Sequence, residues 1–289
     1  LGAINGEWSM PGNWGPDGLP AAGQAAVFNM PSAPAAISLA TDQTLQSILL
    51  DGAALPSHTF SGPGILRLGA GKPGDASATH GGILINTTVS NNQTFNTQVI
   101  GIRNLQFANL SRTPGTTLLL NGLISGDGVS PRDVDFVGSL ATNPSLGAIQ
   151  LAQALGTGIR HVNRSGDCVF ELPSNNQHTG ELRIARGPVS INSTSALGVT
   201  PDSAVVFRPR YKHSDSWRPR LTYNGSGGTS AHTLKLGGWQ ADGILESTGS
   251  GPLVWSGNVV IGPYAENPKQ VLTRDISLTL GASSTSGEN

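Results

Sequence analysis

Residues 208–220, RPRYKHSDSWRPR, form the segment whose residue types are best suited to binding a ligand. Arginine side chains hold carboxylates and phosphates through paired hydrogen bonds, and aromatic rings pack against cations. The segment therefore predicts contact with an acidic glycan or a phosphate. The side chains expected to make that contact are Arg208, Arg210, Tyr211, Trp217, Arg218 and Arg220.

The alternative is that this basic segment has no partner. Asp215 and backbone carbonyl groups would then accept the hydrogen bonds of the arginines, and the segment would be a solvated loop. Both interpretations predict that residues 208–220 form an insertion outside the packed layers of the fold.

Asp133 and Asp135, in the sequence PRDVDFV, are the acids whose spacing is compatible with chemistry. Side chains alternate across a strand, so two acids two residues apart share one face. Paired carboxylates carry out acid and base steps in glycosidases, or bind Ca²⁺. A polysaccharide-acting enzyme would need a third acid and basic groups on the same face. Without them, the pair belongs to a solvated outer face, and Asp127 lies in a Gly-Asp-Gly turn.

No other constellation predicts catalysis or a cofactor. The six histidines are scattered, and none pairs with a second His, a Cys or an acid at the spacing of zinc ligands. Neither a nucleophile elbow nor a Walker loop occurs. Cys168 is the only cysteine, so an internal disulfide is excluded. The sequence therefore predicts no catalytic residue, no metal site and no cofactor.

The composition narrows the class of protein. Charged residues make up 12% of the 289 residues and the net charge is −1, so no global field attracts nucleic acid or acidic lipid. No run of about 18 apolar residues is present, which argues against a transmembrane helix. The 39 Gly residues, with many Ser, Thr and Asn, separate short apolar runs in a way typical of all-β proteins.

These side chains must be positioned by short strands, because strand-like runs recur along the whole chain. The runs are often only three residues long, few Asn-Gly or Asp-Gly hairpin turns occur, and the number of runs exceeds that of a single sandwich. These features favour a parallel β-helix over the alternative, a β-sandwich. The predicted strands are 37–39, 45–50, 65–68, 83–85, 99–102, 118–120, 205–207, 221–223, 234–236, 253–255, 259–261 and 276–280.

One segment departs from this pattern. In residues 141–157, Ile149, Ala152 and Leu155 recur three residues apart, so either a short helix or an irregular loop beside the strands is expected.

The segment 158–198 shows the β-helix pattern most clearly. Cys168, Phe170 and Leu172 fall on one face of a strand, and Cys168 is therefore expected to be a small buried residue. Two further alternating runs follow, 182–184 and 189–191, with turn residues between them. Three short strands within about thirty residues, without a helix, indicate one coil of a β-solenoid.

The same segment resembles the passenger-associated transport repeat, also called the autotransporter-associated β-strand repeat, of large bacterial surface proteins. Gly158, Ile159 and Arg160 open the repeat, and a Gly-x-Gly turn of the family is degenerate at Gly166, where Asp167 and Cys168 follow. The Asn-containing turn and the closing tetrapeptide are Asn176, His178, Thr179, Gly180, and Ser195, Ala196, Leu197, Gly198. Residues 7–28 and 118–128 also resemble the family.

The resemblance implies a right-handed parallel β-helix that is extracellular, on a bacterial cell surface. It further implies a non-catalytic structural or adhesive role, as a rod or a subunit of a surface fibre that self-associates. We expect residues 1–289 to form one solenoid domain, the front part of a longer passenger, with a cap in residues 1–30 built on Trp8 and Trp14. The alternative functions are a polysaccharide-acting enzyme and a glycan-binding module.

Overall fold

The structure is a computed structural model of the chain. It describes residues 5–15, 18–70, 80–138, 147–199, 203–208, 218–236, 242–261 and 277–282. Within these ranges the chain is all-β, with two short 3-10 helices, η1 (Pro11–Asn13) and η2 (Thr194–Leu197). None of the described segments is a helix long and apolar enough to cross a membrane.

The strands form two ten-stranded sheets that face each other, and all strand pairs are parallel. We call them sheet I and sheet II. Sheet I contains, in spatial order, β1 (Ala25–Phe28), β4 (Ser47–Leu50), β7 (His80–Ile85), β10 (Asn104–Asn109), β13 (Arg132–Gly138), β15 (Ile159–Ser165), β17 (Leu182–Ile184), β19 (Val205–Phe207), β22 (Leu234–Leu236) and β25 (Val259–Ile261). Sheet II contains β2 (Ala36–Ser38), β5 (Thr59–Ser61), β8 (Gln93–Phe95), β11 (Thr117–Leu120), β14 (Ala148–Leu151), β16 (Val169–Leu172), β18 (Pro188–Ile191), β20 (Arg220–Tyr223), β23 (Asp242–Ser247) and β26 (Ser277–Ala282).

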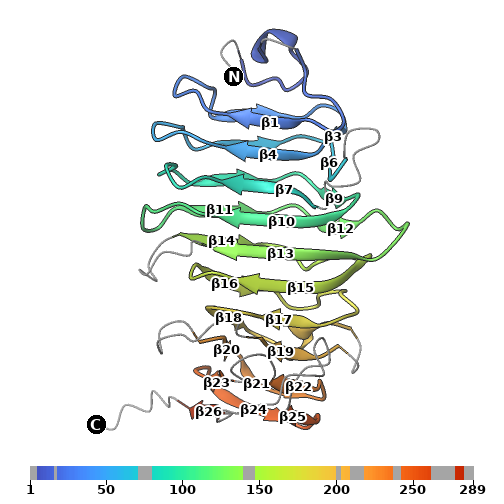
Figure 1. Cartoon of the computed structure of the whole chain (residues 1–289), viewed down its shortest axis with the longest axis vertical. Coiled ribbons are helices and arrows are strands. Elements are labelled where there is room, and N and C mark those ends of the chain that lie inside the picture. The colour runs from blue at the N-terminus through green and yellow to red at the C-terminus, as the bar shows by residue number, and fades with distance from the viewer. Residues whose placement is uncertain are drawn as a thin grey trace, which may run out of the picture.

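Two smaller sheets complete the coils. Sheet III is formed by β3 (Gln43–Leu45), β6 (Leu66–Leu68), β9 (Val99–Gly101) and β12 (Ile124–Gly126). A further pair is formed by β21 (Ser226–Ser230) and β24 (Gly251–Trp255). Figure 1 shows the strands of successive coils stacked along the long axis of the molecule. The chain is therefore a β-solenoid, which confirms the predicted parallel β-helix and excludes the β-sandwich.

The solenoid is held together by an apolar interior that runs the length of the stack. Strand residues alternate between buried and exposed, so that each strand turns one side chain in two towards the interior. Like residues stack from coil to coil: the rings of Phe60 and Phe95 lie parallel with centroids 4.3 Å apart, and those of Phe136 and Phe170 lie 4.5 Å apart. Each coil therefore buries its apolar face against its neighbours.

Buried amide side chains tie the turns of successive coils together. Asn176 accepts a hydrogen bond of 2.8 Å from the backbone N–H of Leu155, and its Nδ2 atom donates to the carbonyl groups of Pro173 and Ala196. Asn109 uses its Nδ2 atom in the same way, because it donates to two backbone carbonyl groups at 2.9 Å. These bonds satisfy backbone groups that the turns would otherwise leave buried and unpaired.

At the N-terminal end of the stack, aromatic side chains cover the first coil. Trp8 is buried, its ring lies 4.8 Å from that of Trp14, and both contact Phe28 of β1. In Figure 1 the N-terminal segment lies across this end of the stack. The arrangement is the one that a cap built on Trp8 and Trp14 requires.

Three expectations from the sequence need correction. Segment 158–198 does not form a single coil, because β16 and β18 pair with each other in sheet II and belong to neighbouring coils. Residues 45–50 are two strands, since the chain leaves sheet III after Leu45 and enters sheet I at Ser47. Residues 148–151 are neither helix nor loop but strand β14, with Ile149 and Leu151 buried, because pairing with β11 and β16 overrides the helical spacing.

Cys168 is fully buried next to Phe170, as predicted for a small core residue. Burial raises the pKa of its thiol, so the sulfur stays protonated. Arg164 is also fully buried, and its Nη2 atom lies 3.4 Å from the Cys168 Sγ atom. Asp167 lies nearby and forms an ion pair with Arg186.

Candidate functional site

The structure describes only the two ends of the predicted basic segment. Arg208 follows β19 of sheet I, whereas Arg220 is the first residue of β20 in sheet II, so the two arginines lie on different sheets. Arg220 is therefore a strand residue rather than part of an insertion, and its Nη1 atom lies 3.1 Å from Glu246 Oε1. Arg218 precedes this strand and is half-buried. Three predicted contact residues lie outside the described residues, and their role stays a prediction: Arg210, Tyr211 and Trp217.

The outer side of sheet I carries a polar hollow of about 510 Å³. It extends across β7, β10, β13, β15 and β17 to Arg208. Asp133 and Asp135 both line it, so the prediction that these acids share one strand face is confirmed. The remaining polar side chains of the hollow include His80, Asn104, Gln106, Asn163 and Arg183.

The register of sheet I places one row of these side chains side by side. Gln106 aligns with Asp135, Asp135 with Asn163, and Asn163 with Arg183. Neighbouring strands lie about 4.8 Å apart, so the side chains in the row are close neighbours. Asn163 Nδ2 donates to Asp135 Oδ1 at 2.7 Å, and His80 Nε2 lies 3.4 Å from Asp135 Oδ2.

A β-bulge between β13 and β15 shapes the other side of the hollow. The register shifts there, so that the backbone of two residues of β15, Arg160 and His161, lies opposite the single residue Asp133 of β13. Arg160 donates two hydrogen bonds to the Asp133 carboxylate, at 3.0 and 3.2 Å. His161 turns the other way, and its Nδ1 atom accepts a hydrogen bond of 2.9 Å from the backbone N–H of Glu181. The bulge therefore lets β15 contact both neighbouring coils, since Arg160 binds Asp133 on β13 and His161 binds the backbone of Glu181 next to β17.

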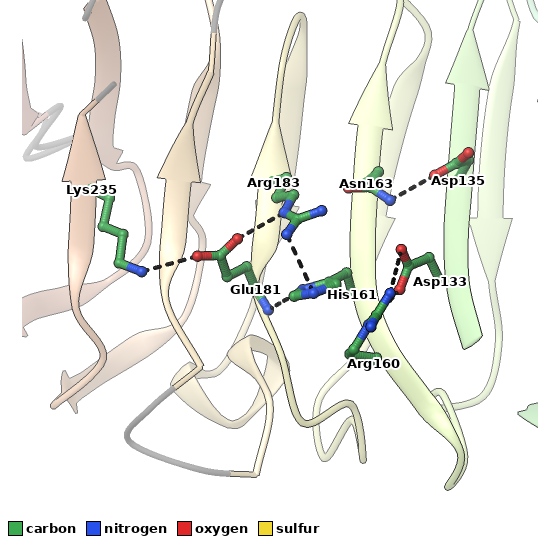
Figure 2. Close-up of polar contacts among 8 residues, drawn as sticks. All are labelled: Asp133, Asp135, Arg160, His161, Asn163, Glu181, Arg183 and Lys235. Atoms are coloured by element: carbon green, nitrogen blue, oxygen red, sulfur yellow. Dashed lines mark hydrogen bonds and ion pairs between the residues drawn. The ribbon is translucent and has the colours of Figure 1, made fainter. Parts of the chain in front are cut away.

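Polar contacts continue from His161 to Arg183, Glu181 and Lys235, as Figure 2 shows. Arg183 Nε lies 2.7 Å from Glu181 Oε2, and Arg183 Nη2 lies 3.3 Å from His161 Nε2. Lys235, on β22, reaches across β19 to place its Nζ atom 2.9 Å from Glu181 Oε1. Glu181 is almost fully buried by these contacts.

The electrostatics of this cluster keep His161 neutral and Arg160 charged. Burial lowers the pKa of His161, and the nearby Arg183 guanidinium lowers it further. Hydrogen bonding and attraction to the Asp133 carboxylate raise the pKa of Arg160. Asp127 is not part of this cluster: it lies beyond β12, where Arg132 binds it at 2.7 Å, as expected of a turn residue.

The arrangement is suited to hydrogen bonding of a polar ligand. Three acids belong to this cluster, and each already contacts a basic or amide side chain: Asp133 with Arg160, Asp135 with Asn163, Glu181 with Arg183 and Lys235. Among the described residues, no group of three or more His, Cys, Asp or Glu is arranged to hold a metal ion.

The sequence identified the two acids of β13 but not their partners. The missed residues are ordinary polar side chains spread over three coils, with nothing local that links them: His161, Asn163, Glu181, Arg183 and Lys235. A signal does exist, since each of these residues except Glu181 occupies an outward position in a strand. Finding the cluster also requires the alignment of coils of unequal length.

Comparison with known proteins adds no further assignment: no family model, no curated protein and no solved structure matches the chain.

Proposed function

We propose that this chain is a rod-forming segment of a non-catalytic extracellular protein, structural or adhesive, on a bacterial cell surface. The observation that carries the proposal is the continuous stack of two ten-stranded parallel sheets around an apolar interior. In such a stack each coil contacts only its neighbours, so added coils lengthen the rod without widening it. A rod of this kind holds another part of a protein away from a surface.

The bacterial surface location is supported by the resemblance to autotransporter repeats, and the structure gives its motif a physical basis. The Asn-containing turn and the Ser-Ala-Leu-Gly tetrapeptide touch each other, because Asn176 Nδ2 donates to the Ala196 carbonyl at 2.9 Å. Ala196 and Leu197 are buried, and Gly198 has a φ of 108°, a backbone conformation that residues other than glycine rarely adopt. The two pieces of the motif therefore act together in joining one coil to the next.

Three measurements test this proposal. Small-angle X-ray scattering is expected to give the profile of an elongated rod, and electron microscopy of concentrated protein is expected to show fibres or end-to-end chains. On the bacterium that makes the protein, antibodies against the chain should label intact cells, and added protease should remove the label. Labelling only after cell lysis would overturn the surface location, and monomers at every concentration would overturn self-association.

A second function is favoured by a specific observation. Asp133 and Asp135 on β13 and Glu181 next to β17 lie in one cluster with several basic groups, and a polysaccharide-acting β-helix enzyme requires such a cluster of acids and basic groups. The test is release of reducing or unsaturated ends from a panel of polysaccharides by the wild-type chain and by Asp133→Asn, Asp135→Asn and Glu181→Gln. Product release that any of these variants abolishes would establish the enzyme and refute the non-catalytic proposal.

A further inference from the structure

We propose that the hollow on the outer face of sheet I is a binding site for an uncharged, linear polysaccharide. The proposal goes beyond a rod function and does not depend on it. It rests on the geometry of the hollow, on hydrogen-bonding groups that the fold leaves unused, and on the distribution of charge along the stack.

Several side chains of the hollow have polar atoms that make no hydrogen bond within the described part of the chain. Gln106 is exposed on β10, and its carboxamide makes no hydrogen bond with the described part of the chain. Asn104 uses only Oδ1, which accepts from the backbone N–H of Asp133 at 3.0 Å, and Asn163 uses only Nδ2. Within the described ranges, Arg183 has a hydrogen-bond partner at Nε and a close contact with His161 at Nη2, but no partner at Nη1. The hollow therefore offers unused donors and acceptors on three strands of sheet I, β10, β15 and β17, with β13 lying between β10 and β15.

The amide and guanidinium groups of the hollow match the hydroxyl groups of a sugar. A sugar hydroxyl both donates and accepts hydrogen bonds, so it matches amide groups, which do the same, and the planar guanidinium, which donates in pairs. Neighbouring strands lie about 4.8 Å apart, so an extended chain lying along the stack meets these groups on β10, β15 and β17 in turn. Asn104 and Asn163 are each held at one atom and Arg183 at two, which reduces the entropy lost when the ligand binds.

The charged side chains of the hollow favour an uncharged ligand. Asp133 and Asp135 lie on β13, in the middle of the hollow, whereas Arg183 and Arg208 lie near its β19 side. A polyanion running along the stack would meet the acids in the middle of the hollow, and a polycation would meet the arginines at its β19 side. An uncharged chain meets neither penalty. No Trp, Tyr or Phe is among the described residues that line the hollow, so stacking adds nothing and the Kd is expected to be on the order of 1 mM.

The test uses the 289-residue chain and three hexasaccharides: cellohexaose and chitohexaose, which are uncharged, and hexagalacturonate, which is a polyanion. Binding is followed by NMR chemical-shift changes of backbone amides in β10, β13 and β15. We expect saturable shifts with at least one uncharged hexamer and a weaker response to hexagalacturonate. Gln106→Ala should weaken binding about fivefold, because it removes hydrogen bonds made only with the ligand.

Gln150→Ala is the matched control. Gln150 is an exposed strand residue of the same type on the outward side of β14 in sheet II, away from the hollow. Its replacement should leave the affinity unchanged. The proposal is overturned by any of three results: no saturable shift with either uncharged hexamer up to about 10 mM, tighter binding of hexagalacturonate, or equal loss of affinity in Gln106→Ala and Gln150→Ala. These results do not bear on the rod, which scattering tests separately.

Discussion

The Nδ1 atom of His161 accepts a hydrogen bond of 2.9 Å from the backbone N–H of Glu181, one coil further along the stack. A ring nitrogen that accepts must be unprotonated, so this bond requires a neutral imidazole. Arg183 Nη2 lies 3.3 Å from the other ring nitrogen. A positively charged imidazole would therefore lose one bond and face a cation, in addition to the cost of burial.

Replacing Arg183 with Met is expected to raise the pKa of His161 towards its ordinary value. The change removes the second cause of the lowered pKa, and it leaves the Glu181 carboxylate with less competition for the imidazole. An NMR titration of the His161 ring measures this directly. Arg67→Met is the control, since Arg67 pairs with Asp42 in a different sheet. An unchanged or lower pKa in Arg183→Met would contradict the arrangement.

Acidification is expected to weaken the fold through His178. Burial lowers the pKa of this side chain from 6.5 to about 4, and His232 adds to the effect. As the pH falls below 6.5, His178 becomes protonated in the unfolded chain, whereas the folded chain keeps it neutral down to about pH 4. The stabilisation is complete above pH 6.5 and decreases by about 3 kcal/mol as the pH falls to about 4.

Thermal unfolding from pH 7 to pH 4 measures this dependence. His178→Gln should make the loss of stability in this pH range shallower than in the wild type. His80→Gln is the control, because His80 is largely exposed on the outer face of sheet I. Equal slopes for wild type and His178→Gln would refute the assignment.

The buried ion pair of Asp167 and Arg186 is expected to matter more than an exposed pair. The side chains are only 5% and 12% exposed. Arg186→Met leaves the Asp167 carboxylate buried with less compensation and should cost about 3 kcal/mol of stability. Arg67→Met breaks a pair whose side chains are 37% and 48% exposed, and should cost less than about 1 kcal/mol. Denaturant unfolding that finds equal costs would show that burial is not the deciding factor.

The buried amide of Asn176 is expected to be a major link between coils. Asn176→Ala removes three hydrogen bonds and leaves the Leu155 N–H and two carbonyl groups without those partners, so we expect a loss of about 3 kcal/mol. In contrast, Asn121 bonds Asn96 at the surface, and Asn121→Ala should cost less than about 1 kcal/mol. Hydrogen exchange should show the extra opening around Leu155 and Ala196. Uniform exchange rates in both variants would argue against a cross-coil link.

Removing Trp8 is expected to open the N-terminal end of the stack. The side chain is 1% exposed and contacts Trp14 and Phe28, so Trp8→Ala should cost about 4 kcal/mol locally. The uncovered first coil offers strand edges to other molecules, and light scattering should therefore increase. Met10→Ala changes an exposed residue of the same segment and should do neither. Unchanged exchange of the β1 amides in Trp8→Ala would mean that the segment is not a cap.

Much of the fold could be predicted from local patterns in the chain. The alternation in Cys168, Phe170 and Leu172, and in Val189 and Ile191, identifies which side chains enter the core, because alternation depends only on the strand and not on its neighbours. The same rule placed Asp133 and Asp135 together on the outer face of a strand. Short strands and the scarcity of hairpin turns then indicated a solenoid.

The partners of those acids were decided by tertiary structure alone. Arg160 follows Asp133 by 27 residues, whereas Glu181 follows His161 by only 20, so no fixed period brings the cluster together. The bulge in β15 adds a further shift of one residue, which turns Arg160 to one coil and His161 to the next. Local alternation determines whether a side chain points in or out, but its neighbours depend on the length of each loop and on how the coils stack.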